Sequence, residues 1–156
     1  MPNWCGNRLS INGLTETQQN ELVEAILAEQ LLETYIPTPE DVDGLDFHRE
    51  AWGTKWDVGG EVDFIGEELV AFFNSAWCPP IEGLETISRL FPEASFRLAY
   101  DEPGMAYCGV TYFNNGEVED NYINYSGIPG VEELDFDDDE VFERLESLVE
   151  EWINDK

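Results

Sequence analysis

Polar and apolar positions along this chain follow two periods, which together predict six strands and three helices. The alternation from Asn7 to Ile11 ends at an Asn-Gly pair and predicts a first strand. Apolar residues then recur at helical spacing behind Thr15, so we expect a helix with this residue as N-cap that reaches about Glu33. Further strands are expected at 61–65, 69–73, 95–100, 107–113 and 118–125, and further helices at 81–91 and 138–153.

Residues 34–60 show neither period and contain six glycines and prolines, which predicts a long loop. Loops of this length in a compact domain are usually functional or packed by their own side chains. Trp52 and Trp56 favour an ordered loop. Residues 126–136 carry Gly127, Pro129 and Gly130 and are expected to form a linker arm.

The order β-α-β-β-α-β predicts an α+β protein with a ferredoxin-like antiparallel sheet, followed by an extra β-hairpin and a C-terminal acidic helix. We expect one ferredoxin-like domain over residues 1–130. The remainder, 131–156, is expected to be the linker arm and an amphipathic acidic helix packed on the same domain.

Negative charge then restricts the possible partners. The chain has 35 Asp and Glu but only 7 Lys and Arg in 156 residues, a formal net charge of −28. Direct nucleic-acid binding needs Lys and Arg to neutralise phosphates, and an anionic membrane repels such a surface. With 42% hydrophobic residues the chain still has enough apolar material for a core. It carries no recognisable signal peptide or membrane-length apolar run, so we expect a cytoplasmic protein.

The sequence offers few candidates for catalytic residues. Cys5, Cys78 and Cys108 lie far apart without the paired spacing of zinc or redox motifs, so we expect reduced, mostly buried thiols. His48 is the one imidazole, and no P-loop, dinucleotide-binding or nucleophile-elbow motif occurs. The acidic run 137–140 lacks the ligand pattern of an EF-hand loop. We therefore expect no enzymatic activity, no cofactor and no metal site.

Acidic residues are densest on the predicted C-terminal helix. At 1.5 Å per residue they give roughly one charge per 3.4 Å, close to the spacing of phosphates along one DNA strand. Such a row can stand in for a nucleic-acid backbone, although a solvated helix face is the simpler explanation. The residues expected to contact a basic partner are Asp138, Asp139, Glu140, Glu143, Glu146 and Glu150.

Tryptophans form a second candidate site. Trp52, Lys55 and Trp56, together with Trp77, could build a stacking or cation–π pocket for a small ligand. Tryptophans in long loops also commonly wedge the loop onto a sheet, which is the structural alternative.

Five short stretches resemble the YubB-type ferredoxin-like domain family of phages and conjugative plasmids. The resemblance spans about residues 1–116 and implies a ferredoxin-like fold and a mobile-element origin, but no established activity and no catalytic residue. Cys78 stands where we expect Ser from the family pattern, which puts in doubt any role for a hydroxyl there. The stretches are Met1–Cys5, Trp52–Asp57, Ala76–Pro80, Leu90–Pro92 and Tyr100–Gly104.

The leading hypothesis is a mobile-element protein that mimics nucleic acid. It would inhibit a host nucleic-acid-binding defence enzyme, of the restriction or CRISPR type, by occupying the basic cleft of that enzyme. One alternative is a salt-adapted accessory protein without mimicry, and another is a small-ligand or nucleotide-binding module that uses the Trp-rich loop. The sequence leaves open whether the chain forms a homodimer.

Overall fold

The computed structural model describes residues 3–127, 134 and 141–154, and for residues 141 and 142 the backbone alone. Six strands form one antiparallel sheet in the order β2-β3-β1-β4-β5-β6. The strands are β1 (Trp4–Asn12), β2 (Gly60–Ile65), β3 (Glu68–Ala76), β4 (Ser95–Glu102), β5 (Tyr107–Asn114) and β6 (Glu117–Asn124). The helical segments are α1 (Glu16–Leu27), α2 (Leu31–Tyr35), α3 (Gly44–Phe47), the π-helix η1 (His48–Trp52), α4 (Ile81–Leu90), the 3-10 turn η2 (Tyr125–Gly127) and α5 (Val141–Asn154).

The first part of the chain confirms the predicted ferredoxin-like arrangement. The elements β1, α1, β2, β3, α4 and β4 follow one another, and β1 lies between β3 and β4. Each helical crossover therefore joins two parallel strands that have one antiparallel strand between them. The hairpin of β5 and β6 extends the sheet beyond β4, as the sequence predicts.

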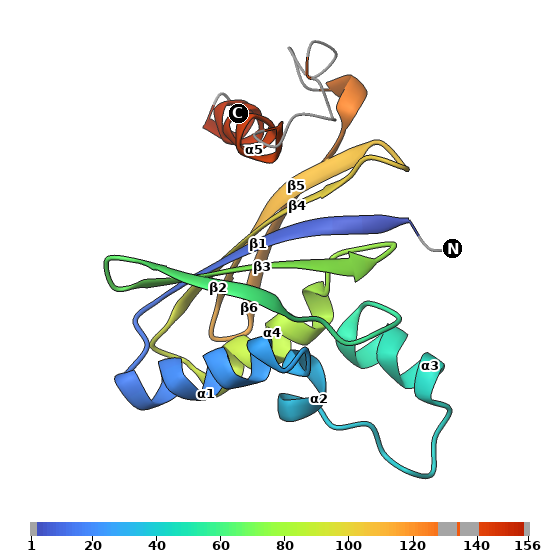
Figure 1. Ribbon diagram of the computed structural model, residues 1–156. Coiled ribbons are helices and arrows are strands. Elements are labelled where there is room, and N and C mark those ends of the chain that lie inside the picture. Colours follow the sequence, from blue (N-terminus) through green and yellow to red (C-terminus); the bar gives the residue numbers. More distant parts are fainter. Residues whose placement is uncertain (1–2, 128–133, 135–140, 155–156) are drawn as a thin grey trace.

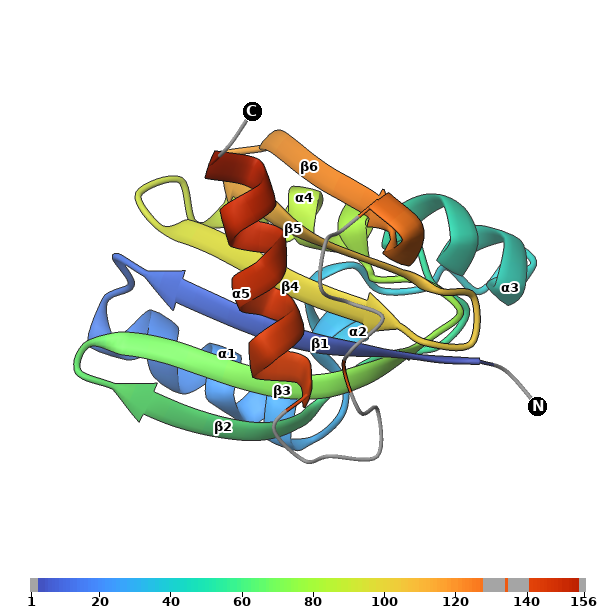
Figure 2. The same cartoon turned by 90° about the horizontal axis from the view of Figure 1, so that it is seen from above.

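Helices cover both faces of the sheet. Figure 1 shows α1, α2 and α4 on one side, here called the helix face, and α5 on the other, here called the α5 face. Figure 2 shows α5 lying across the strands. The sheet therefore has two hydrophobic cores, a first core on the helix face and a second core on the α5 face. Because side chains alternate along a strand, Phe96 and Leu98 of β4 lie in the first core and Ala99 lies in the second. In the second core, Leu145 and Val149 of α5 are almost fully buried.

Helix α1 begins as predicted but ends early. Thr15 and Gln18 form a capping box at its start. The helix was expected to reach Glu33, but it ends at Leu27 because the chain turns at Glu29, whose φ is +58°. Gly59 passes against this turn so closely that a Cβ there would lie 2.3 Å from the Glu29 Cα.

The segment 34–60 is ordered, but it is not the irregular loop that was expected. It contains α3 and η1, and α2 precedes them. Trp52 is 2% exposed and donates from Nε1 to the Ile36 carbonyl at 3.0 Å. Its ring stacks on His48 with centroids 3.7 Å apart. The tryptophan therefore packs this segment against the core, which is the structural alternative considered above.

Turn residues set the β5–β6 hairpin as predicted, because Asn115 and Gly116 both have positive φ, the conformation of a type I′ turn. Strands β3 and β4 run longer than expected, to Ala76 and Glu102. Of the predicted linker arm, residues 126–127 and 134 are described and the others lie outside the described residues. None of the described helices combines the length and apolar character that crossing a bilayer requires.

Candidate functional site

The predicted acidic row on α5 is interrupted at its centre, where Glu146 faces the sheet. The Glu146 side chain is 11% exposed, with Oε1 2.5 Å from Arg97 Nη1 and Oε2 3.3 Å from Arg8 Nη1. Glu150 also pairs with Arg97. The expectation that Glu146 points outward is therefore wrong, because two arginines on adjacent strands draw it into the interface. Glu143 is exposed, whereas Asp138, Asp139 and Glu140 lie outside the described residues.

These ion pairs outweigh the cost of burying the guanidinium. Burial alone lowers the pKa of Arg97, but the carboxylates of Glu146 and Glu150 raise it above its ordinary value. Arg8 and Arg97 come from neighbouring strands and share the α5 face with Phe72, over whose ring the Arg8 guanidinium lies at 5.9 Å. The centre of α5 is therefore a structural contact rather than a free acidic surface.

The four residues of the predicted Trp-rich pocket do not line one site. Trp52 belongs to the first core, whereas Trp56 and Trp77 are 42% and 43% exposed. Lys55 Nζ lies 4.8 Å from the centroid of the Trp56 ring, so these two residues form a cation–π contact with each other. Trp56 also approaches Trp4, with centroids 6.0 Å apart. The prediction of one shared pocket is therefore corrected: Trp52 is buried, and the indoles of Trp56 and Trp77 are exposed separately.

Most of the stretches that carry the family resemblance nevertheless meet at one end of the sheet. Trp4 pairs with Ala76 where β1 begins and β3 ends, and the Thr54 hydroxyl donates to the Ala76 carbonyl at 3.1 Å. Three further hydrogen bonds tie this end together: Trp77 N to Asn3 O (2.8 Å), Cys78 Sγ to Gly53 O (2.8 Å) and Tyr107 Oη to Trp77 O (2.6 Å).

Next to this junction, a cavity of about 230 Å³ opens between the start of α4 and the helix face of β4, β5 and β6. We call it the tyrosine pocket, because one tyrosine from each of these strands lines it. The ring centroids of Tyr100 and Tyr107 are 6.2 Å apart, and those of Tyr107 and Tyr122 are 5.1 Å apart. Its lining consists of Gly53, Cys78, Pro79, Ile81, Glu82, Tyr100, Tyr107, Asp120 and Tyr122.

Gly109 makes room for this pocket. It lies between Tyr100 and Tyr122 in one cross-strand row of the sheet. A Cβ on Gly109 would lie 2.4 Å from the Tyr100 hydroxyl and 2.6 Å from the Asn121 carbonyl oxygen. Tyr100 can therefore cross over β5 toward β6 because this position has no side chain.

The polar groups of the pocket are two carboxylates and neutral hydroxyls. Asp120 Oδ1 accepts from the Tyr100 hydroxyl at 2.8 Å and from the Thr111 hydroxyl at 2.7 Å. Burial, reinforced by the Asp120 hydrogen bond, raises the pKa of Tyr100, so this phenol stays a donor. Burial and the nearby Glu82 raise the pKa of Cys78, which stays a thiol. Sequence reasoning missed this site because its residues meet only once the strand register is known.

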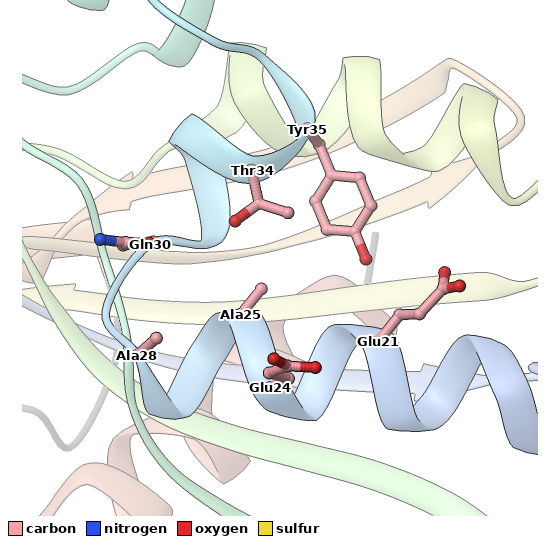
Figure 3. A pocket seen from close by; sticks show the side chains of 7 residues that line it. All are labelled: Glu21, Glu24, Ala25, Ala28, Gln30, Thr34 and Tyr35. Atoms are coloured by element: carbon pink, nitrogen blue, oxygen red, sulfur yellow. The ribbon is translucent and has the colours of Figure 1, made fainter.

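A second hollow lies between α1 and α2, with a volume of about 320 Å³. Figure 3 shows Glu21 and Glu24 on α1 and Tyr35 on α2, with the Tyr35 ring pointing toward α1. The Tyr35 hydroxyl is buried and has no hydrogen-bond partner among the described residues. Burial and then Glu21 raise the pKa of this phenol.

This hollow lies beside a larger group of acidic residues, here called the acidic edge, which extends around the β2 edge onto both faces of the sheet. Glu61 and Asp63 of β2 pair with Phe72 and Val70 and point to the α5 face, whereas α1 lies on the helix face (Figure 1). Helix α1 and strand β2 lie side by side at this edge of the molecule (Figures 1 and 2). No Lys or Arg occurs between Arg8 and Arg49 or between Lys55 and Arg89. The exposed carboxylates of the acidic edge are Glu16, Glu21, Glu24, Glu29, Glu61, Asp63 and Glu67. Within the described segments, no three His, Cys, Asp or Glu side chains gather as metal ligands.

Comparison with known proteins gives a family and a fold. A family model described as a ferredoxin-like domain in Api92-like protein matches residues 47–140. A crystal structure of protein api92 from Yersinia pseudotuberculosis matches with a TM-score of 0.49 and 22% identity, over 60% of this chain and 39% of that chain. The chain thus spans about two fifths of that protein, and no curated protein matches. The family match confirms the ferredoxin-like fold, while the YubB-type, phage or plasmid assignment stays a prediction.

Proposed function

This chain belongs to the family of ferredoxin-like domains in Api92-like proteins, and we propose that it is a non-catalytic acidic inhibitor that mimics nucleic acid. Its partner is a basic nucleic-acid-binding defence enzyme of the host, whose cleft it occupies. The resemblance of its short motifs to phage and plasmid proteins supports a mobile-element origin. In this proposal the protein contacts neither nucleic acid nor membrane directly.

The observation that carries the proposal is the acidic edge. Seven exposed carboxylates lie on α1, on the turn that follows it and on the β2–β3 hairpin, and the sequence places no Lys or Arg in these segments. Elsewhere, the positive charge is partly neutralised, since Arg8, Arg97 and Arg89 form ion pairs. A surface of one sign attracts a basic cleft from a distance and speeds association. The proposed contact surface is therefore the acidic edge, with Glu143 on α5 as an outlying member.

The state of the nucleophilic and basic groups supports a binding role rather than catalysis. Burial raises the pKa of Cys5 and of Cys108 to about 12, so neither thiol ionises readily near neutral pH. His48 uses Nδ1 for the Lys55 carbonyl at 2.8 Å and Nε2 for the Thr38 hydroxyl at 3.0 Å. The one imidazole of the chain is thus engaged in holding the 34–60 segment together.

An inhibition assay with charge-matched variants tests the proposal. Variant one changes Glu16, Glu21, Glu24 and Glu29 on the acidic edge to Gln, and its control changes Glu40, Glu50, Glu117 and Glu119 to Gln. Both variants lose four charges, so their net charge is the same. DNA binding and cleavage by a panel of restriction and CRISPR enzymes are then measured with increasing amounts of each protein.

We expect the unsubstituted protein to inhibit at least one enzyme, and more weakly as salt increases. The edge variant should inhibit that enzyme about tenfold less well, whereas the control should differ by about twofold or less. Equal loss in both variants, or no inhibition of any enzyme at low salt, would contradict the proposal.

A second candidate is salt adaptation without mimicry, because exposed carboxylates also lie away from the acidic edge. Glu117 and Glu119 line the opposite edge strand, and Glu40, Asp41 and Glu50 lie in the 34–60 segment. High salt screens repulsion between such charges. Under this alternative the melting temperature rises steeply between about 0.1 and 3 M KCl and the inhibition assay is negative. A melting temperature that changes little over this range would count against it.

A further inference from the structure

The geometry points to the tyrosine pocket as a receptor for one arginine side chain of the basic partner. This inference rests on the proposed function, because it names a second contact of the same partner. The pocket lies on β4, β5 and β6, at the other end of the strand order from the acidic edge at β2. The pocket is about 230 Å³, below the roughly 300–1,000 Å³ typical of small-molecule sites, so it suits a side chain better than a nucleotide.

The aromatic walls of the pocket favour a flat cation. The rings of Tyr107 and Tyr122 are tilted by 36° to each other. Tyr122 is 51% exposed, whereas Tyr107 is buried. A guanidinium that enters past Tyr122 can therefore stack on an accessible phenol ring. Arginine is planar and weakly hydrated, which makes it better suited than lysine to stack on an aromatic ring.

The carboxylates of the pocket supply the negative charge that complements a guanidinium. Tyr100 and Thr111 both donate to Oδ1 of Asp120, which fixes the orientation of this carboxylate. Among the described residues none donates to Oδ2, so this oxygen is available to a guanidinium N–H. Glu82 is a second exposed carboxylate of the lining, and the lining contains no Lys or Arg. A cation is therefore the ligand class that these groups can neutralise.

The structure offers a matched pair of variants for the test. Asp120→Asn removes one charge but keeps an oxygen that can accept from Tyr100 and Thr111. Glu119→Gln removes one charge from the neighbouring residue, whose side chain points to the opposite face of the sheet. Tyr122→Leu removes the exposed ring, and its position at the surface allows the fold to persist.

The probe is Nα-acetyl-arginine amide, titrated into each protein and followed by two-dimensional NMR, with the citrulline analogue as an uncharged probe of nearly equal shape. We expect saturable shifts near residues 107–110 and 120–123. Binding should weaken at least about fivefold in Asp120→Asn and in Tyr122→Leu, and by less than about twofold in Glu119→Gln. Citrulline amide should bind far more weakly than arginine amide.

Equal weakening in Asp120→Asn and Glu119→Gln, equal binding of citrulline and arginine amides, or the absence of saturable shifts would overturn the inference. The outcome is separable from that of the inhibition assay, because the four-residue variant of the acidic edge leaves the tyrosine pocket intact. Arginine binding without enzyme inhibition would thus support the pocket and contradict the proposed function. Inhibition without arginine binding would support the proposed function and contradict the arginine pocket.

Discussion

Arg97 of β4 and Glu146 of α5 lie against each other in the interface between the sheet and the C-terminal helix, with Nη1 and Oε1 2.5 Å apart. Arg8 of β1 holds the other carboxylate oxygen at 3.3 Å. The chain has only seven Lys and Arg, and it places two of them beneath an acidic helix. An acidic amphipathic helix can therefore pack on this sheet face because its inward carboxylates are neutralised there.

Replacing Arg97 tests this attachment. Arg97→Gln leaves the largely buried Glu146 carboxylate with Arg8 alone, so we expect the free energy of unfolding to fall by about 2 kcal/mol. Urea unfolding followed by circular dichroism measures the change. The control is Arg89→Gln, which breaks the more exposed pair with Glu85 on α4 and should cost below about 0.5 kcal/mol. Similar losses in the two variants would show that the Arg97 pair does not anchor α5.

Local signals in the sequence were sufficient for the parts of the fold that depend on neighbouring residues. Thr15 and Gln18 lie three positions apart and form the capping box that starts α1. Asn115 and Gly116 alone determine the turn between β5 and β6. The order of helices and strands, read from periodicity, then leads to the ferredoxin-like topology, because few chain paths are compatible with it.

Features that depend on distant residues could not be predicted in this way. Helix α2 is capped by Asp57, which lies 25 positions from Leu32 and accepts from the backbone amide of that residue. Glu146 faces inward because strand pairing places Arg8 and Arg97 together, at sequence separations of 138 and 49. The tyrosine pocket likewise needs the register that aligns Tyr100 with Gly109. A sequence pattern indicates which face of an element is apolar, but it does not identify the partner of that face.

Asp57 provides a second prediction about stability, again from a contact between residues distant in the sequence. Its carboxylate accepts from the backbone N–H groups of Leu32 at 2.7 Å, Glu33 at 3.0 Å and Val58 at 2.8 Å, and so caps α2 from outside the helix. We expect Asp57→Ala to lower the free energy of unfolding by about 1–2 kcal/mol, the usual cost of a lost cap. Chemical denaturation provides the measurement. The exposed Asp41→Ala serves as control, and a loss of equal size there would contradict the capping role.

Asp101 predicts a specific pH dependence. Burial raises its pKa from 3.8 to about 6, opposed by the hydrogen bond from Tyr125 and increased by the neighbouring Glu102. Because the folded pKa is the higher one, protonated Asp101 favours the folded state. This contribution is complete below about pH 4 and is lost as the pH rises through about 6, up to about 3 kcal/mol.

Asp101→Asn keeps an oxygen that can accept from Tyr125 but cannot ionise. Relative to the unsubstituted protein, it should therefore gain stability as the pH rises from about 4.5 to about 7, with the difference largest at the upper end. Urea unfolding of dilute protein at intervals across this range measures the difference, in which the titration of the other carboxylates cancels. Parallel stability curves for the two proteins would refute the raised pKa.

Two tryptophans of the 34–60 segment should respond very differently to truncation. Trp52 is 2% exposed, stacks on His48 and donates to the Ile36 carbonyl, so Trp52→Ala should cost about 3–5 kcal/mol of unfolding free energy. Trp56 is 42% exposed and contacts Trp4 and Lys55, so Trp56→Ala should cost about 1 kcal/mol or less. Thermal melts of the two variants, with intrinsic fluorescence as a second readout, provide the comparison. Comparable destabilisation in both variants would mean that the 34–60 segment packs through both rings, whereas the expected contrast would show that Trp52 alone anchors it.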